Sequence, residues 1–142
     1  MNGMIIMSVD LGKARTGIAV SDESCQFAFP KEVITEYNTD RLVEKICQKA
    51  AEFKALRIVV GYPKNMDGTL GERARECAET AKKIESESGI QTVLWDERCT
   101  TVTAHNYLNM NNVRGQKRKK TVDAVAAVII LEDYLRSIAN GL

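Results

Sequence analysis

Residues 4–20, MIIMSVDLGKARTGIAV, contain two apolar runs joined by a short polar segment. The first run is apolar at nearly every position, which predicts a strand buried on both faces. Gly12 and Gly17 bracket the polar segment, and residues 18–20 form the second run. Two strands this close together favour an antiparallel hairpin. The segment therefore puts Asp10 at the end of a buried strand, directly before a glycine turn.

The rest of the chain alternates between strand and helix patterns. A third strand is predicted at residues 27–34, and Pro30 in its middle favours the edge of a sheet, because proline cannot donate to a strand ladder. The later elements are, in order, a helix capped by Thr39 that ends near Lys54, a strand at 57–61, a helix from about Leu70 to Ser88 that stops at Gly89, a strand at 91–96, a short helix at 101–109, a loop at 111–120 and a final helix capped by Thr121 that runs to Asn140. The order βββαβαβαα predicts an α/β fold with a mixed sheet and helices on its faces, in a single domain of residues 1–142.

Composition excludes several classes of protein. Of the 142 residues, 44% are apolar, 27% charged and 6% aromatic, which is typical of a globular domain and not of a disordered, collagen-like or disulfide-rich chain. The four cysteines form no C-x-x-C pair and the chain has a single histidine, so we expect no zinc site. Without a secretory signal or an apolar stretch of about 20 residues, we expect a cytoplasmic protein that binds no membrane.

Positive charge is concentrated in one short segment. The chain has 20 Lys and Arg against 19 Asp and Glu, a net charge of +1. Five of the basic residues lie between positions 111 and 121 with no acid among them: Arg114, Lys117, Arg118, Lys119 and Lys120. The remaining 15 basic residues face 19 acidic ones, so the rest of the chain is net negative. The segment is typical of an anion-binding surface or of a solvated loop, and its composition alone does not separate the two.

Common catalytic motifs are missing from the sequence. His105 is the only histidine and lies in a short polar helix, where a catalytic role has little support. No G-x-S-x-G motif is present. Gly12 and Gly17 have the spacing of a Walker A loop, but Ile18 and Ala19 occupy the positions that lysine and serine or threonine would need.

Acidic residues at the ends of predicted elements remain as candidates. Asp10 ends the first strand, Asp96 and Glu97 end the strand QTVLW, and Asp123 lies in the first turn of the predicted final helix. The carboxyl ends of parallel strands open on one crevice, so these acids are expected to converge there. Carboxylates gathered in this way repel one another unless a divalent cation neutralises them.

Each acid also has a simpler explanation. Asp10 before a glycine is a common turn residue, Asp96 and Glu97 suit a solvated strand end, and Asp123 suits the dipole at a helix N-terminus. Asp123, however, shares a helical face with four apolar or aromatic residues: Ala126, Ala127, Ile130 and Tyr134. An aspartate on such an apolar stripe needs a partner, because burying an unpaired charge is costly. Asp123 is therefore the strongest single acid.

Four motifs in order carry a family resemblance. They are Asp10-Leu-Gly-x-x-Arg15-x-Gly17-Ile-Ala, Gly61-Tyr-Pro63 with Asp67-Gly68, Asp96-Glu97-Arg98-x-Thr100-Thr101, and Lys119-Lys120 followed by Asp123-x-x-Ala126-Ala127. Over residues 4–135 the chain resembles the YqgF (RuvX) family of RNase H-like proteins. The resemblance implies an RNase H-like fold, with a mixed five-stranded sheet whose second strand is antiparallel and with helices on both faces.

The resemblance also implies a function. It points to a metal-dependent nuclease of the bacterial cytoplasm that acts in 5′-end processing of pre-16S rRNA. Two alternatives are a Holliday junction resolvase acting on branched DNA and a non-catalytic RNA-binding factor of ribosome assembly. A nucleotide phosphotransferase of the actin or sugar-kinase type is disfavoured, because that architecture duplicates the domain and 142 residues hold one copy.

The implied site residues can be placed on this sequence. Asp10, Glu97 and Asp123 are expected to be the catalytic metal ligands for two Mg²⁺ or Mn²⁺ ions, with Asp96 as the alternative to Glu97. Arg15 and Arg98 would hold a phosphate or pair with the neighbouring acids, and the basic segment 114–120 would grip a nucleic-acid backbone. The expected partner is nucleic acid, either precursor rRNA or branched DNA, bound by a monomer or weak homodimer.

Overall fold

The computed structural model describes residues 4–12, 14–62, 71–96 and 115–139. For Asp96, residues 115–124 and Ala139 it describes the backbone alone. The short helix predicted at 101–109 lies outside these residues. None of the described helices is long and apolar enough to cross a membrane.

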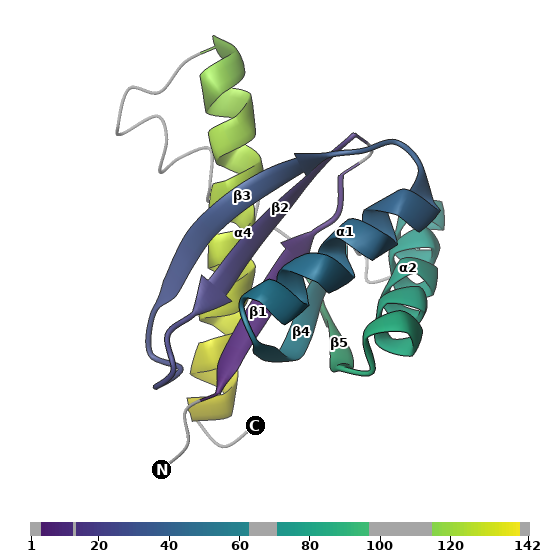
Figure 1. Cartoon of the computed structure of the whole chain (residues 1–142). Coiled ribbons are helices and arrows are strands. Elements are labelled where there is room, and N and C mark those ends of the chain that lie inside the picture. Colours follow the sequence, from purple (N-terminus) through teal and green to yellow (C-terminus); the bar gives the residue numbers. More distant parts are fainter. Residues whose placement is uncertain (1–3, 13, 63–70, 97–114, 140–142) are drawn as a thin grey trace.

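Five strands form one mixed sheet (Figure 1). The strands are β1 (Ile5–Asp10), β2 (Arg15–Ser21), β3 (Ala28–Thr35), β4 (Ala55–Tyr62) and β5 (Gln91–Asp96), in the spatial order β3-β2-β1-β4-β5. The pairs β1–β2 and β2–β3 are antiparallel, whereas β1–β4 and β4–β5 are parallel. The predicted hairpin, the antiparallel second strand and the edge position of the strand that contains Pro30 are confirmed.

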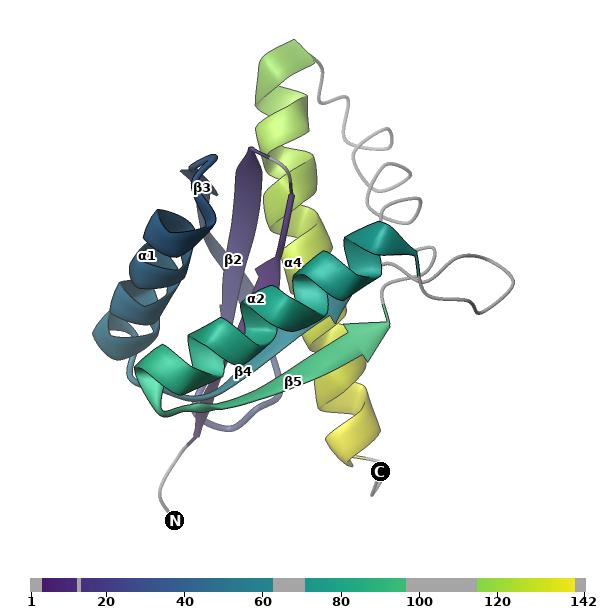
Figure 2. The same ribbon diagram turned by 90° about the vertical axis from the view of Figure 1, so that its right-hand side faces the viewer.

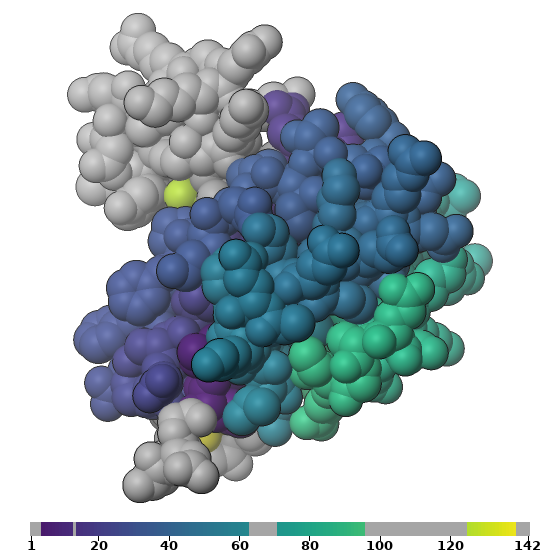
Figure 3. All heavy atoms as spheres, in the orientation of Figure 1, coloured from purple at the N-terminus to yellow at the C-terminus, as the bar shows by residue number. Residues whose placement is uncertain are grey.

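Three described helices cover the two faces of the sheet (Figures 1 and 2). Helices α1 (Thr39–Glu52) and α2 (Glu72–Ser88) lie on one face, and the long helix α4 (Gly115–Ala139) crosses the other. In the space-filling view, side chains of α1 and α2 close over the middle of their face (Figure 3). The predicted arrangement of helices on both faces is therefore confirmed.

Strand β1 supplies the centre of both cores. Its side chains alternate between the two faces, so that Met7 and Val9 pack under α1 and α2 while Ile6 packs under α4. All three are fully buried, as the unbroken apolar run predicts. Ser8 lies on the α4 face, and its hydroxyl donates to the Ala127 carbonyl at 2.7 Å. This bond ties Ala127 of α4 to the level of Ser8 along β1.

Helix α1 begins one residue earlier than its sequence suggests. Asn38 is the N-cap, and its side chain accepts a hydrogen bond from the Arg41 amide, so the prediction of Thr39 as the cap is wrong. Both residue types cap helices well, and asparagine ranks slightly higher. The apolar stripe of Leu42, Ile46 and Ala50 is buried as predicted.

Helix α2 ends where predicted. Gly89 takes the left-handed conformation, with φ of 70°, and its amide bonds to the Glu85 carbonyl. Glycine adopts this conformation without steric cost, so the helix stops there.

Helix α4 begins at Gly115, so the predictions of a loop at 111–120 and of Thr121 as the cap are wrong for residues 115–121. The residues that follow Gly115 are Gln, Lys and Arg, which are good helix formers, but they carry no apolar period that would reveal a helix. Asp123 therefore lies more than two turns into α4. The dipole explanation for Asp123 no longer applies, because that effect is confined to the first turn.

Candidate functional site

The carboxyl ends of the three parallel strands form one edge of the sheet. Asp10 of β1 is level with Gly61 of β4, and the next residue, Tyr62, is level with Asp96 of β5. Strands are spaced about 4.8 Å apart, so the backbones of Asp10 and Asp96 lie about 10 Å from each other along this edge. The prediction that these strands end at the same edge is confirmed, and the convergence of the two carboxylates stays a prediction.

Asp10 has no side chain directly beside it in either neighbouring strand. Its register partners are Gly17 of β2 and Gly61 of β4. Asp10 itself is half-buried and continues the Ile6 and Ser8 side of β1, which is the face covered by α4. Glycine within a strand often marks a place where a ligand or another backbone comes close to the sheet.

The Ser8–Ala127 hydrogen bond brings Asp123 to the same level. Helix α4 runs antiparallel to β1 (Figures 1 and 2), so the direction from Ser8 to Asp10 matches the direction from Ala127 back to Asp123. One helical turn covers about 5.4 Å and two strand residues cover about 6.6 Å. The backbone of Asp123 therefore lies over the sheet at the level of Asp10 along β1.

Arg15 joins this edge from β2. It is the first residue of that strand and lies half-buried. Alternation puts Arg15 on the same face as Gly17 and Ala19, and Ala19 packs under α4. Arg15 and Asp10 thus share the α4 face of the sheet.

The remaining predicted site residues are described in part or not at all. Lys117, Arg118, Lys119 and Lys120 lie in the first turns of α4, N-terminal to Asp123, with their side chains outside the description. Glu97, Arg98 and Arg114 lie outside the described residues.

The residues of this edge fit a hard divalent cation. Carboxylate oxygens are the ligands that Mg²⁺ and Mn²⁺ prefer, and aspartates stand at the end of β1 (Asp10), at the end of β5 (Asp96) and on α4 (Asp123). In β5 it is Trp95, the residue before Asp96, that packs on the α4 face with which Asp10 is aligned. Among the side chains that the structure describes, no group of three or more His, Cys, Asp or Glu is close enough to hold a metal.

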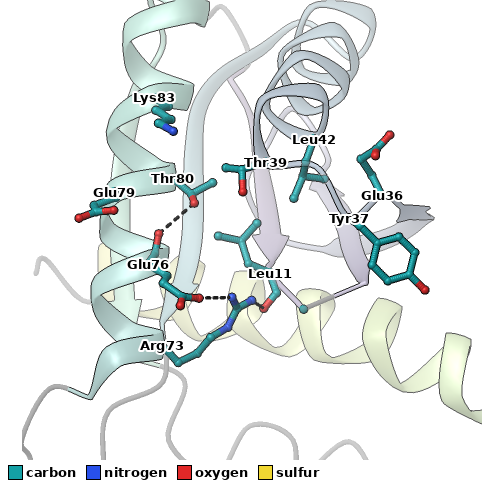
Figure 4. A pocket seen from close by; sticks show the side chains of 11 residues that line it. Leu11, Glu36, Tyr37, Thr39, Leu42, Arg73, Glu76, Glu79, Thr80 and Lys83 are labelled. Atoms are coloured by element: carbon teal, nitrogen blue, oxygen red, sulfur yellow. Dashed lines mark hydrogen bonds and ion pairs between the residues drawn. The ribbon is translucent and has the colours of Figure 1, made fainter.

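Sequence patterns missed one contact near the site. Arg73 in the first turn of α2 donates from Nη2 to the carbonyl oxygen of Leu11 at 2.7 Å (Figure 4). Leu11 directly follows Asp10 in the chain. The only sequence signal was an arginine near the start of a predicted helix, which says nothing of its partner.

On the same side of the molecule, a carboxyl group has an altered acidity. The pKa of Glu36 is held below its ordinary value, mainly because the side chain accepts a hydrogen bond from the Lys45 ammonium at 2.9 Å. The Asn38 amide is a second donor to the Glu36 carboxylate. Both hydrogen bonds lie at the connection from β3 to α1.

Residues 4–137 match the model of the RuvX family, described as Holliday junction resolvase. The chain belongs to the RuvX family. A relative from Lachnospira eligens named "Putative pre-16S rRNA nuclease" is 42% identical over 137 residues, which cover 94% of this chain and 98% of the relative. A protein of the same name from Bacillus subtilis is 39% identical over 137 residues, covering 95% and 99%.

Solved structures show the same fold as this RuvX family member. Thermus thermophilus RuvC in complex with a Holliday junction substrate superposes with a TM-score of 0.63 at 13% identity, covering 96% of each chain. The fowlpox virus resolvase with its Holliday junction DNA has a TM-score of 0.61 at 12% identity, covering 95% of this chain and 99% of the resolvase. The RNase H-like fold is therefore confirmed.

Proposed function

We propose that this protein is a metal-dependent nuclease that hydrolyses phosphodiester bonds in the 5′-end processing of pre-16S rRNA. One observation carries the proposal: Asp10 ends the central strand between two glycines, at the level of the Asp123 backbone and one residue short of the level of Asp96. The name of the Lachnospira and Bacillus relatives supports the choice of substrate.

In this proposal, Asp10, Glu97 and Asp123 hold the cations, and Asp96 is the alternative to Glu97. Mg²⁺ or Mn²⁺ bound by carboxylates polarises a phosphate and lowers the pKa of an attacking water. The glycines beside Asp10 let the sugar–phosphate backbone approach the sheet edge.

Cationic side chains hold the substrate. Arg15 shares the face of Asp10, and its planar guanidinium can donate two parallel hydrogen bonds to one phosphate. Lys117, Arg118, Lys119 and Lys120 approach along α4 and bind neighbouring phosphates without reading bases. Arg98 and Arg114 are further candidates for contacts with phosphate. We place this activity in the cytoplasm, where precursor rRNA is processed, and expect a monomer or weak homodimer.

A second candidate is a resolvase of branched DNA. The description of the RuvX family favours it, and the structural neighbours with bound junctions share its fold. Both candidates use the same acids, and they differ in the substrate that fits over the edge.

One assay distinguishes these functions. Purified protein is incubated with precursor rRNA, single-stranded RNA and a four-way DNA junction, in Mg²⁺ or Mn²⁺ and in excess chelator. We expect metal-dependent cleavage of precursor rRNA. Cleavage of the junction alone would establish the resolvase, and metal-independent binding without cleavage of any substrate would establish a non-catalytic RNA-binding factor.

A further inference from the structure

Arg73 links helix α2 to the turn that follows Asp10. Its Nη2 donates to the Leu11 carbonyl oxygen at 2.7 Å, across 62 positions of sequence (Figure 4). That carbonyl belongs to the residue directly after Asp10, so the contact bears on the backbone that carries the carboxylate.

The Arg73 side chain is itself held in place. Its Nη1 donates to Glu76 Oε2 at 3.0 Å, from one turn further along α2. Only 34% of the Arg73 side chain is exposed. The guanidinium therefore bonds to Leu11 and to Glu76 at the same time.

The turn between β1 and β2 is also held from its other side. The Glu36 amide donates to the Ala14 carbonyl at 3.0 Å, and Glu36 is in turn fixed by Lys45. A Cβ on Gly12 would lie 2.1 Å from the Arg15 carbonyl oxygen, so the turn folds tightly on itself. A shift of Leu11 would accordingly be passed on to Asp10.

A cavity of about 180 Å³ lies beside this turn, on the face of α1 and α2. Arg73 and Lys83 both line it, and each has an acidic partner: Glu76 for Arg73, and Asp40 at 3.7 Å for Lys83. Cations that are already paired with acids in this way bind an anionic ligand weakly. The contact of Arg73 that bears on function is therefore its hydrogen bond to the Leu11 carbonyl, in the turn after β1.

We propose that Arg73 is a positioning residue, which holds the turn after Asp10 so that the Asp10 carboxylate keeps the orientation needed for cleavage. This inference rests on the proposed function. Groups that orient a ligand residue without touching the reacting atoms commonly contribute 10- to 100-fold to activity. Displacements of about 1 Å in a reacting group have effects of that size.

The test compares substitutions of Arg73 with a control on the same helix. Arg73→Gln should lower kcat about 10- to 100-fold with KM unchanged, because the residue touches no substrate. Arg73→Lys should retain part of the rate, since an ammonium can still donate to the Leu11 carbonyl. Glu76→Gln should lower kcat by a smaller factor, because Arg73 is kept but loses the ion pair that orients its guanidinium. Arg75→Gln, an exposed position two residues along α2, should leave kcat unchanged.

A second measurement does not depend on catalysis. Hydrogen exchange of the peptide spanning residues 10–15 should be faster in Arg73→Gln than in wild type or Arg75→Gln. A raised KM with normal kcat would overturn the proposal, since it would make Arg73 a substrate contact. Unchanged kcat well below the melting temperature, or unchanged exchange, would also overturn it. If the wild type cleaves nothing, the proposed function fails, and exchange still decides whether Arg73 holds the turn.

Discussion

At the scale of single residues, Asp10 stands out because its register partners in both neighbouring strands are glycines. Glycine within a strand weakens it, because glycine loses more conformational freedom on folding and packs nothing. Here two glycines, Gly17 and Gly61, occupy the register positions on both sides of one aspartate. Local rules of stability are broken most often at functional sites, and this pair of glycines therefore favours the proposed role of Asp10.

Substitution of Asp10 tests this interpretation. Asp10→Asn keeps the volume of the side chain and removes its charge, so we expect cleavage to be abolished while the melting temperature stays the same or rises. Relief of repulsion between neighbouring carboxylates is the physical reason for the rise. Asp133→Asn, which removes a carboxylate that pairs with Arg136 on α4, is the matched control and should cleave normally. A cleaving Asp10→Asn protein, purified free of contaminating nuclease, would remove Asp10 from the mechanism.

Residue-level prediction succeeded where the signal was local. Gly89 was identified as a helix stop because glycine is the residue that takes positive φ without strain. The cap of α1 was misplaced by one residue, because Asn38 and Thr39 are adjacent and both suitable. The Arg73–Leu11 bond could not be predicted, because a contact between residues 62 positions apart leaves no periodic trace in the sequence.

At the scale of elements, α4 carries an unusual charge distribution. Its first turns contain Lys117, Arg118, Lys119 and Lys120, and no acid lies in its first turn. Cations near a helix N-terminus are disfavoured by the helix dipole. A nucleic-acid backbone on this end of α4 would offset that repulsion.

Replacement of Lys117, Arg118, Lys119 and Lys120 by alanine separates nucleic-acid binding from catalysis. The slope of log K against log salt for a single strand should fall by about 0.7 per lost phosphate contact, so by up to about 3. The helix should persist, because alanine is the best helix former. Nucleic-acid affinity measured at several salt concentrations gives the slope. Replacement of Arg75 and Lys82, exposed on α2, serves as control, and equal slopes in wild type and the fourfold variant would show that the segment binds no phosphate.

The docking of α4 on β1 can be tested at the Ser8–Ala127 bond. Ser8→Ala should cost about 1 kcal/mol of unfolding free energy and should lower kcat, because α4 loses the bond that sets its height. Ser137→Ala removes another buried serine bond, to Tyr134, but one within α4. It should affect stability alone. Denaturant unfolding and single-turnover cleavage measure the two effects, and a normal rate in Ser8→Ala would show that this bond does not align the site.

Patterns within one element predicted most of the sheet and two of the helices. The hairpin, the edge strand, α1, α2 and β5 each carry their own apolar period or turn residues. The start of α4 lacks such a period, so its first turns were taken for a loop. The common position of Asp10 and Asp96 followed from a topological rule for parallel strands, and their roles stay predictions.

At the scale of the whole molecule, the proposed site joins one edge of the sheet to α4 and draws on distant parts of the chain. Metal binding that needs β1, β5 and α4 together exists in the folded state alone. Such binding stabilises the fold by RT ln(1 + [L]/Kd), about 2.7 kcal/mol at a hundredfold excess over Kd.

This linkage predicts a thermal shift. Mn²⁺ should raise the melting temperature of the wild type by several degrees, and that of Asp123→Asn much less. Asp133→Asn, on the same helix, should shift like the wild type. Melting temperatures of the three proteins, measured at several Mn²⁺ concentrations, test this prediction. Equal shifts in the wild type and Asp123→Asn would exclude Asp123 as a ligand.

The Ser8–Ala127 bond spans 119 positions and has a consequence for the newborn chain. A ribosome releases β1 long before α4, and proteins begin to fold from their N-terminal parts during synthesis. Until α4 emerges, Ile6 and Ala19 lack their cover and Asp123 is absent from the edge. The proposed site, which needs Asp123, is therefore incomplete until α4 has left the ribosome.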